Sequence, residues 1–148
     1  MKLVVGQGSC GIAAGASKVF DAISAYNDGK FEIGISGCIG MCYLEPIVDV
    51  YQNDTLIHRL VKVSEKDGEA IAKAASTGNF DSVSSLFISE EDKSFLSQQT
   101  RIALRHCGLI DPTDINAYIK IDGYSAIKKV LSTMSPEDVI EEIKVSGL

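Results

Sequence analysis

Short apolar segments alternate with helical segments over residues 1–76, and this alternation restricts the fold more than any other feature of the sequence. Apolar residues at helical spacing predict a helix over 13–27. A capping-box pair, Ser64 with Asp67, predicts a second helix that ends near Ala75. Four further segments have the apolar content or the period of two that predicts a β-strand: 2–5, 31–35, 46–51 and 55–61. The order strand, helix, three strands, helix predicts an α/β fold with helices packed on a mixed sheet.

The remainder of the sequence is predicted to be helical. A serine-containing segment, 77–89, has few strong helix formers, and we interpret it as a linker. Ser135 followed by Pro136 is typical of the start of a helix, whose apolar face would then need a partner. Helices are predicted over four segments: 90–107, 116–121, 124–134 and 136–145. We therefore expect an α/β domain over 1–76 and a helical part over 90–148.

Charge and hydropathy exclude two classes of function. The net charge is −6 and Lys and Arg form no long cluster, which argues against binding of nucleic acid. No segment approaches the roughly 18 consecutive apolar residues of a membrane-spanning helix, so we expect no direct insertion into a membrane. The first residues resemble no signal peptide, and we expect a cytoplasmic protein.

Three cysteines lie in glycine-rich loops that follow predicted strands. Cys10 follows the first strand, and Cys38 and Cys42 follow the second. Small buried cysteines are the simpler interpretation. Loops after strands are common places for ligand-binding residues, however, and we favour metal ligation. If the two strands are neighbours, the three thiols converge at one edge of the sheet.

Two other kinds of site are less well supported at these loops. The loop around Cys10 could bind phosphate, but it has no Lys to contact the terminal phosphates. Thiol redox chemistry by Cys38 and Cys42 is a third alternative, although three residues separate them rather than the two of thioredoxin-type motifs.

The fourth cysteine and the two histidines are predicted to be structural. Cys107 ends a predicted helix beyond the linker, and we interpret it as a packed thiol. His58 is predicted on the solvent face of its strand, and His106 in the last turn of a helix. Neither histidine has a partner at catalytic spacing, which argues against a cysteine hydrolase.

The sequence resembles a known family over nearly its whole length. GSCGIAAGA (8–16) and GCIGMCYLEPIVDVY (37–51) resemble the thioredoxin-like [2Fe-2S] ferredoxin domain. Residues 95–148 are similar to the segment that precedes the flavin-binding region in NADH-oxidising flavoprotein subunits. Those subunits occur in respiratory complex I, in NAD-dependent formate dehydrogenases and in electron-bifurcating [FeFe]-hydrogenases. The fusion of both parts resembles the hydrogenase β-subunit type.

The resemblance implies a [2Fe-2S] cluster held by Cys10, Cys38 and Cys42. The family's remaining cysteine would fall at position 5, where this sequence has Val5, so either another group completes the site or no cluster binds. The resemblance further implies single-electron transfer to a flavin and to other clusters within a complex of several subunits. FMN and NAD would bind in a region that follows residue 148, so this chain alone is not expected to be catalytic. The alternative is a cluster-free thioredoxin-like docking module.

Overall fold

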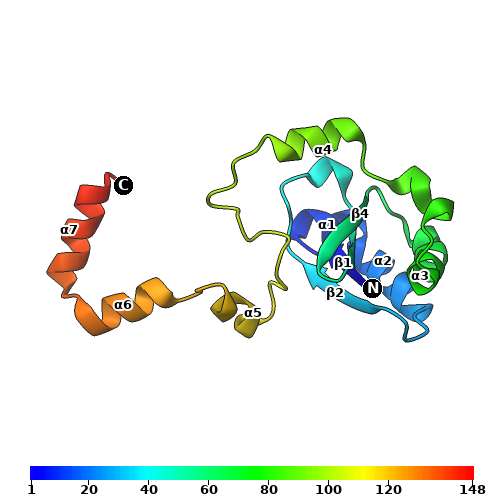
Figure 1. Cartoon of the computed structure of the whole chain (residues 1–148). Helices are drawn as coiled ribbons and strands as arrows, with labels where there is room; N and C mark the ends of the chain where they lie inside the picture. The colour runs from blue at the N-terminus through cyan, green and yellow to red at the C-terminus, as the bar shows by residue number, and fades with distance from the viewer. The chain divides into compact units, whose positions relative to one another are not determined.

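The structure is a computed structural model that describes residues 1–148. It contains two compact units, Met1–Pro112 and Thr113–Leu148 (Figure 1). The strands, α-helices and 3-10 helices (η) of the first unit are, in chain order, β1 (Lys2–Gly6), α1 (Ser9–Ala14), α2 (Ala16–Ala25), β2 (Glu32–Ser36), η1 (Cys42–Leu44), β3 (Val48–Gln52), β4 (Thr55–Leu60), η2 (Glu65–Asp67), α3 (Gly68–Thr77), η3 (Asp81–Leu86) and α4 (Glu90–Ser97).

The four strands form one mixed sheet in the order β2-β1-β3-β4. β1 and β2 are parallel, with Gly6 paired to Ser36 at their carboxyl ends. β3 runs antiparallel to both β1 and β4. The predicted α/β class with a mixed sheet is therefore confirmed. Because β1 and β2 are parallel neighbours, the loops that follow them leave the sheet at the same edge.

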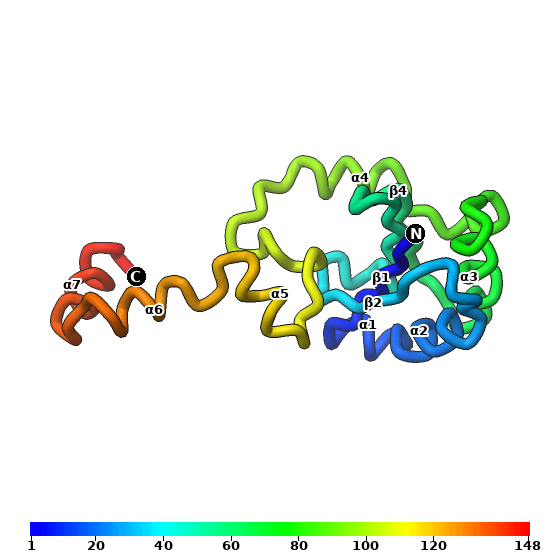
Figure 2. The backbone as a smooth tube through the Cα atoms, turned by 60° about the horizontal axis from the view of Figure 1, so that its bottom comes forward, coloured from blue at the N-terminus to red at the C-terminus, as the bar shows by residue number.

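The main apolar core lies between the sheet and the helices α2 and α3. α1 and α2 run beside β1 and β2 in Figure 2, and α3 packs against α2. The side chains that are at most 1% exposed in this core are Leu3, Val5, Ala16, Val19, Ile23, Val48, Val50, Leu60, Ile71 and Ala72. Burial of these apolar groups is the largest favourable contribution to folding.

The helix predicted over 13–27 is two helices in the structure. α1 ends and α2 begins at Gly15, whose φ of 104° lies in the left-handed region. Glycine adopts this φ without a steric penalty, so the chain can turn between the two helices. The break allows α1 to begin at Ser9, directly after β1, which puts Cys10 in a helical first turn.

The segment predicted as a linker, 77–89, packs in the first unit. It contains η3, and Phe80, Val83 and Ile88 are buried. Its backbone also pairs with the end of β4, since Ile88 N donates to the Arg59 carbonyl. The segment's serines suggest a loop, but its apolar residues determine its placement. The boundary between the compact units lies after Pro112 instead.

His58 lies on the covered face of β4, not on the solvent face as predicted. Its ring stacks on Phe87 with centroids 4.5 Å apart, and it also contacts Phe80 at 5.1 Å. Both aromatic residues belong to the segment 77–89. The prediction was wrong because it treated that segment as a linker, which left β4 without a cover.

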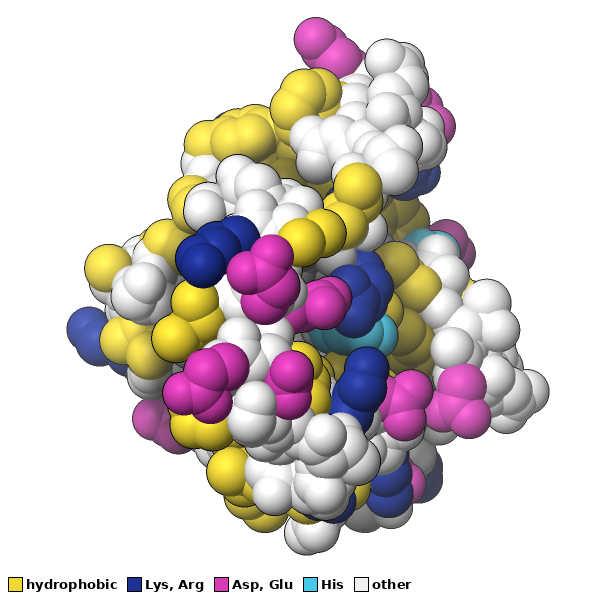
Figure 3. Space-filling view, turned by 90° about the vertical axis from the view of Figure 1, so that its left-hand side faces the viewer, with side chains coloured by type: hydrophobic (Ala, Val, Ile, Leu, Met, Phe, Trp, Pro, Cys, Tyr) yellow, Lys and Arg dark blue, Asp and Glu magenta, His cyan; other side chains and the backbone are white.

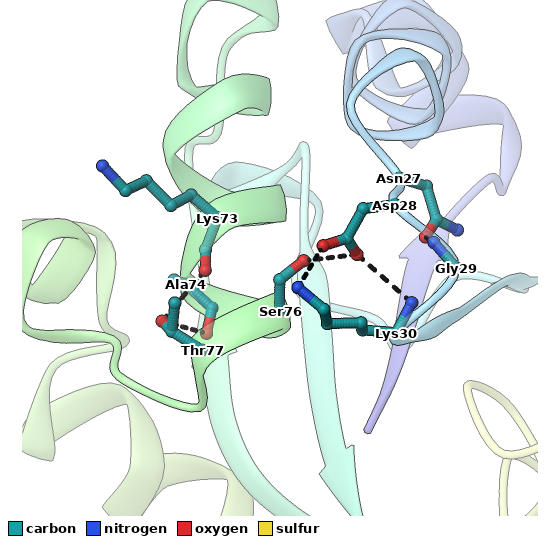
Figure 4. Close-up of polar contacts among 8 residues, drawn as sticks. All are labelled: Asn27, Asp28, Gly29, Lys30, Lys73, Ala74, Ser76 and Thr77. Atoms are coloured by element: carbon teal, nitrogen blue, oxygen red, sulfur yellow. Dashed lines mark hydrogen bonds and ion pairs between the residues drawn. The ribbon is translucent and has the colours of Figure 1, made fainter.

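Hydrogen bonds tie the loop before β2 to the end of α3. The Asp28 carboxylate accepts from the Ser76 hydroxyl at 2.8 Å and pairs with Lys30 at 2.8 Å (Figure 4). The bond from Lys30, followed by that from Ser76, lowers the pKa of Asp28 to about 2. This contact fixes the entry to β2, the strand that leads to Cys38.

The helix predicted over 90–107 ends at Ser97. Residues 98–112 contain turns and no helix. Ile102 and Leu104 are 73% and 51% exposed, so their spacing does not mark a buried helix face. The segment instead returns to the loop after β2, as described below.

The second unit, Thr113–Leu148, consists of α5 (Ile115–Lys120), α6 (Ser125–Thr133) and α7 (Pro136–Ser146). α7 begins after Ser135 with Pro136 in its first turn, as the sequence predicted, and Ser135 and Asp138 exchange the hydrogen bonds of a capping box. None of the three helices has a buried residue.

Surface charge is mixed. Figure 3 shows acidic, basic and hydrophobic side chains intermingled on one face, with no large basic patch. No helix in either unit is both long enough and apolar enough to cross a membrane.

Candidate thiol-ligand site

The structure brings Cys10, Cys38 and Cys42 together at the edge of the sheet where β1 and β2 end. Cys10 lies in the first turn of α1, Cys38 in the loop after β2, and Cys42 at the start of η1. The three Sγ atoms all lie within 4.8 Å of one another. Cys10 Sγ is 3.3 Å from Cys38 Sγ, and Cys38 Sγ is 3.6 Å from Cys42 Sγ. The arrangement follows from the parallel pairing of β1 with β2.

The two loops approach closely because a glycine lies between them. A Cβ atom at Gly8 would lie 2.7 Å from the Cβ of Cys38, closer than real side chains come. Gly8 therefore lets the backbone before α1 pack directly on the cysteine loop. The loop after β2 is further fixed by a small apolar cluster, whose buried members are Ile39, Met41, Leu44, Ile47, Val61 and Ile88.

The pKa values of Cys10 and Cys38 are shifted in opposite directions. Hydrogen bonding with Cys38, and then with Cys42, lowers the pKa of Cys10. Burial raises the pKa of Cys38 to about 12, although a hydrogen bond from Gly40 N–H to its Sγ, at 3.3 Å, acts in the opposite direction. Of these two thiols, Cys10 is therefore the one that ionises first, and it lies at the N-terminal end of a helix. Because the buried Cys38 thiolate is poorly stabilised by its surroundings, a bound metal would have to stabilise it.

Residues 101–108 cover the cysteine loop from outside. Arg101 Nη2 donates to the Ile39 carbonyl at 2.7 Å, and its Nη1 donates to the Cys107 carbonyl at 3.5 Å. A Cβ atom at Gly108 would lie 2.3 Å from Ile39 Cγ2, so this segment packs directly on the loop. No motif in the sequence marks Arg101, and sequence analysis did not identify it.

A buried carboxyl group lies beneath the Cys10 loop. Glu45 is 8% exposed and its Oε2 accepts from Ile47 N–H at 2.9 Å. The same oxygen lies 3.2 Å from the place a Cβ would take on Gly11. Burial, followed by repulsion from Asp49, raises the pKa of Glu45. No motif in the sequence points to this residue.

Asp49 itself belongs to a buried ion pair on β3 and β4. The Arg59 fork donates two hydrogen bonds to its carboxylate, at 2.6 and 2.7 Å. Burial alone would lower the pKa of Arg59, but the hydrogen bonds and charge of Asp49 outweigh burial and raise it. The pair lies on the sheet face opposite the main core, because its neighbours Val48, Val50 and Leu60 all face that core.

The other residues considered from the sequence lie outside the thiol cluster. Cys107 is half-buried and its Sγ is not part of the group of three. His106 accepts a hydrogen bond from Arg105, and His58 packs on aromatic rings. Val5 is fully buried in the main apolar core.

The fold and the site define a class: an α/β domain with a three-thiol site where two parallel strands end. No family model matches the chain. One curated protein is 51% identical over 51 residues, the NADP-reducing hydrogenase subunit HndC of Solidesulfovibrio fructosivorans. The match covers 34% of this chain and only 10% of that protein.

Among solved structures, the chain is similar to a thioredoxin-like [2Fe-2S] ferredoxin from Aquifex aeolicus. The wild-type ferredoxin gives a TM-score of 0.49 with 20% identity, over 60% of this chain and 96% of that one. A variant of the same ferredoxin gives 0.49 with 23% identity, over 60% and 98%.

Proposed function

We propose that this chain is an electron-transfer domain of an NAD(H)-linked iron–sulfur flavoprotein oxidoreductase, in which Cys10, Cys38 and Cys42 hold a [2Fe-2S] cluster. The observation that carries the proposal is the convergence of three Sγ atoms within 4.8 Å of one another. The 51% identity to a segment of a hydrogenase subunit supports the same class of complex. The domain would work in the cytoplasm beside the other subunits, while FMN and NAD would bind elsewhere in the assembly.

The donor set fits an iron–sulfur cluster. Thiolates are the soft ligands that iron–sulfur clusters take. A tetrahedral metal with thiolate bonds of about 2.3 Å holds two sulfurs roughly 3.8 Å apart. Either Sγ separation, 3.3 Å for Cys10 and Cys38 or 3.6 Å for Cys38 and Cys42, is close to what one iron needs from a pair of thiolates, and the third thiol would then ligate the second iron.

A cluster held here would supply reversible one-electron transfer, and residues around the three cysteines would act on it. The Gly40 N–H donates to Cys38 Sγ, and the apolar cluster of Ile39 and Met41 excludes water from one side. Cys42 is exposed, so the site is open to a partner on that side. Hydrogen bonding and burial of this kind set a cluster's potential.

Cysteine variants test the proposal, with Cys107→Ala as a matched control. After anaerobic reconstitution, Cys10→Ala, Cys38→Ala and Cys42→Ala should each lose most of the iron and acid-labile sulfide that the wild type binds. Cys107→Ala should keep the wild-type content, because its Sγ lies outside the group of three. Equal iron in all four variants would contradict the assignment of these ligands.

The fourth ligand is not supplied by position 5, where Val5 is buried in the apolar core. We propose an oxygen ligand, from Ser9, from water or from a partner chain, since iron accepts oxygen as well as sulfur. Val5→Cys should then raise the iron content and slow the loss of the cluster in air, because a fourth thiolate would take the place of the oxygen ligand. Iron analysis before and after exposure to oxygen measures both effects.

A second candidate is a cluster-free docking module with the same fold. The observation in its favour is Val5, whose side chain packs in the core at the position of a family ligand. This alternative predicts that the wild type and Val5→Cys both stay free of iron after reconstitution. Cys38 and Cys42 would then be found as free or disulfide-linked thiols.

A further inference from the structure

One peptide group connects a cation to a candidate ligand. The carbonyl of Ile39 accepts from Arg101 Nη2 at 2.7 Å. The N–H of Gly40, on the other side of the same peptide bond, donates to Cys38 Sγ at 3.3 Å. Guanidinium, peptide and sulfur therefore form a continuous hydrogen-bonded chain from Arg101 to Cys38.

We propose that Arg101 is a positioning residue that acts through the Ile39–Gly40 peptide to strengthen and aim the N–H···S bond to Cys38, and so favours the reduced cluster. The proposal rests on the proposed function, because it concerns the potential of a cluster at this site. Arg101 does not contact a cysteine thiol in any hydrogen bond of the structure, and its effect is transmitted by the peptide.

Polarisation gives the first reason. A cation that binds a carbonyl oxygen draws electron density along the amide, which makes the N–H a stronger donor, and hydrogen bonds in such chains reinforce one another. A reduced cluster carries one more negative charge than an oxidised one. A stronger donor to a ligand sulfur therefore stabilises the reduced state more and raises the potential.

Orientation gives the second reason. Gly40 has a φ of 90°, a region that glycine adopts without a steric penalty. Because glycine also adopts other conformations readily, the loop's own sequence does not fix the plane of this peptide. The bond from Arg101 holds the carbonyl on the outer side of the loop and leaves the N–H directed at the sulfur.

Arg101 is itself held in place. Its second nitrogen donates to the Cys107 carbonyl, and Gly108 packs against Ile39 with no room for a side chain. The guanidinium group therefore bonds to the carbonyls of both Ile39 and Cys107, which holds the segment 101–108 over the loop. This gives the segment after α4 a role in the site that its sequence does not indicate.

The test compares Arg101→Met with Arg105→Met, a matched control. Arg105 lies in the same segment but is exposed, and it bonds to His106 and the Ile102 carbonyl rather than to the cysteine loop. In metal-free protein, the NMR signal of the Gly40 amide proton should shift in Arg101→Met and stay in place in Arg105→Met. Arg101→Lys, which keeps the charge but loses the fork, should shift this signal less than Arg101→Met.

In reconstituted protein, Arg101→Met should have a more negative reduction potential than the wild type. The reduced cluster should lose stabilisation equal to about one hydrogen bond. At a fixed applied potential, the ratio of reduced to oxidised cluster should then be roughly two- to tenfold lower than in the wild type. Arg105→Met should match the wild type, and Arg101→Lys should lie between. Circular dichroism of each variant checks that the fold is kept.

Two results would overturn the inference. One is an unchanged Gly40 amide signal in Arg101→Met. Even if this variant lost its cluster, the influence of Arg101 on the site would then not pass through the Ile39–Gly40 peptide. The other is a potential equal to that of Arg105→Met. If the wild type took up no cluster, the proposed function would fail, whereas the amide signal would still report whether Arg101 acts on Gly40.

Discussion

The two compact units of this chain have similar helical signals but very different burial. In Met1–Pro112, Leu60 is fully buried in a core shared by sheet and helices. In Thr113–Leu148, Leu131 is 80% exposed and no helix has a buried residue. α7 nevertheless begins with a complete capping box. Local sequence therefore specifies helices in both units, whereas burial of apolar residues stabilises them only in the first.

The thiol site depends on the well-packed unit. Its three cysteines are held by strand ends and by two apolar clusters, all within residues 1–112. The helices of the second unit are at most 11 residues long. Isolated helices shorter than about 12–15 residues are marginal in water. Matched changes in the two units should therefore have unequal effects on the free energy of unfolding.

The largest difference is expected for ion pairs. Arg59→Met leaves the Asp49 carboxylate, 4% exposed in its side chain, without its partner. Removing one member of a buried pair costs about 3–5 kcal/mol. Lys144→Met, which removes an exposed pair with Glu141 in the second unit, should give no measurable change. Urea unfolding of both variants measures the difference, and equal stabilities would contradict the burial of Asp49.

Leucine truncation compares apolar packing in the two units. Leu60→Ala should lower the free energy of unfolding by about 2–5 kcal/mol, since it removes buried groups and leaves a cavity. Leu131→Ala should change it by less than about 0.5 kcal/mol, because the side chain is exposed. Thermal unfolding followed by circular dichroism distinguishes the two. A large loss for Leu131→Ala would show that the second unit has a packed face.

A smaller effect, with a defined pH dependence, is expected at Glu45. Its pKa is raised above the ordinary 4.5. The folded protein therefore binds this proton more tightly than the unfolded chain, and stability falls as the pH rises through 4.5 to the raised pKa. Glu45→Gln cannot ionise and keeps an oxygen for Ile47 N–H. It should be more stable than the wild type near pH 7 and equal to it below the ordinary pKa.

Asp138 in the second unit should show the opposite sign. The backbone and side-chain hydrogen bonds of Ser135 lower its pKa, so the capping stabilisation is present above the ordinary 3.8 and is lost as the pH falls through the lowered value. NMR shifts of α7 during acid titration would follow this loss. If Glu45 and Asp138 showed the same sign, the contrast between a buried and an exposed carboxylate would be wrong.

The sequence predicted the α/β class and the convergence of three thiols, because both follow from local patterns and one assumption about strand order. It did not predict the burial of segment 77–89, where widely spaced apolar residues such as Phe80 and Val83 lie among serines. Arg101 could not be found either, since 62 residues separate it from Ile39. The Asp49–Arg59 pair could not be found either, because a register shift between Val50 and Tyr51 moves Arg59 opposite Asp49, where the turn alone would place His58.

The most direct test of the central claim is a one-electron titration of anaerobically reconstituted protein, followed by electron paramagnetic resonance. A [2Fe-2S] cluster on Cys10, Cys38 and Cys42 predicts two irons and two sulfides per chain, and a spin-one-half signal that appears as one electron is taken up. A chain that takes up neither iron nor sulfide and shows no such signal, while all four cysteines react as free thiols, would contradict the account.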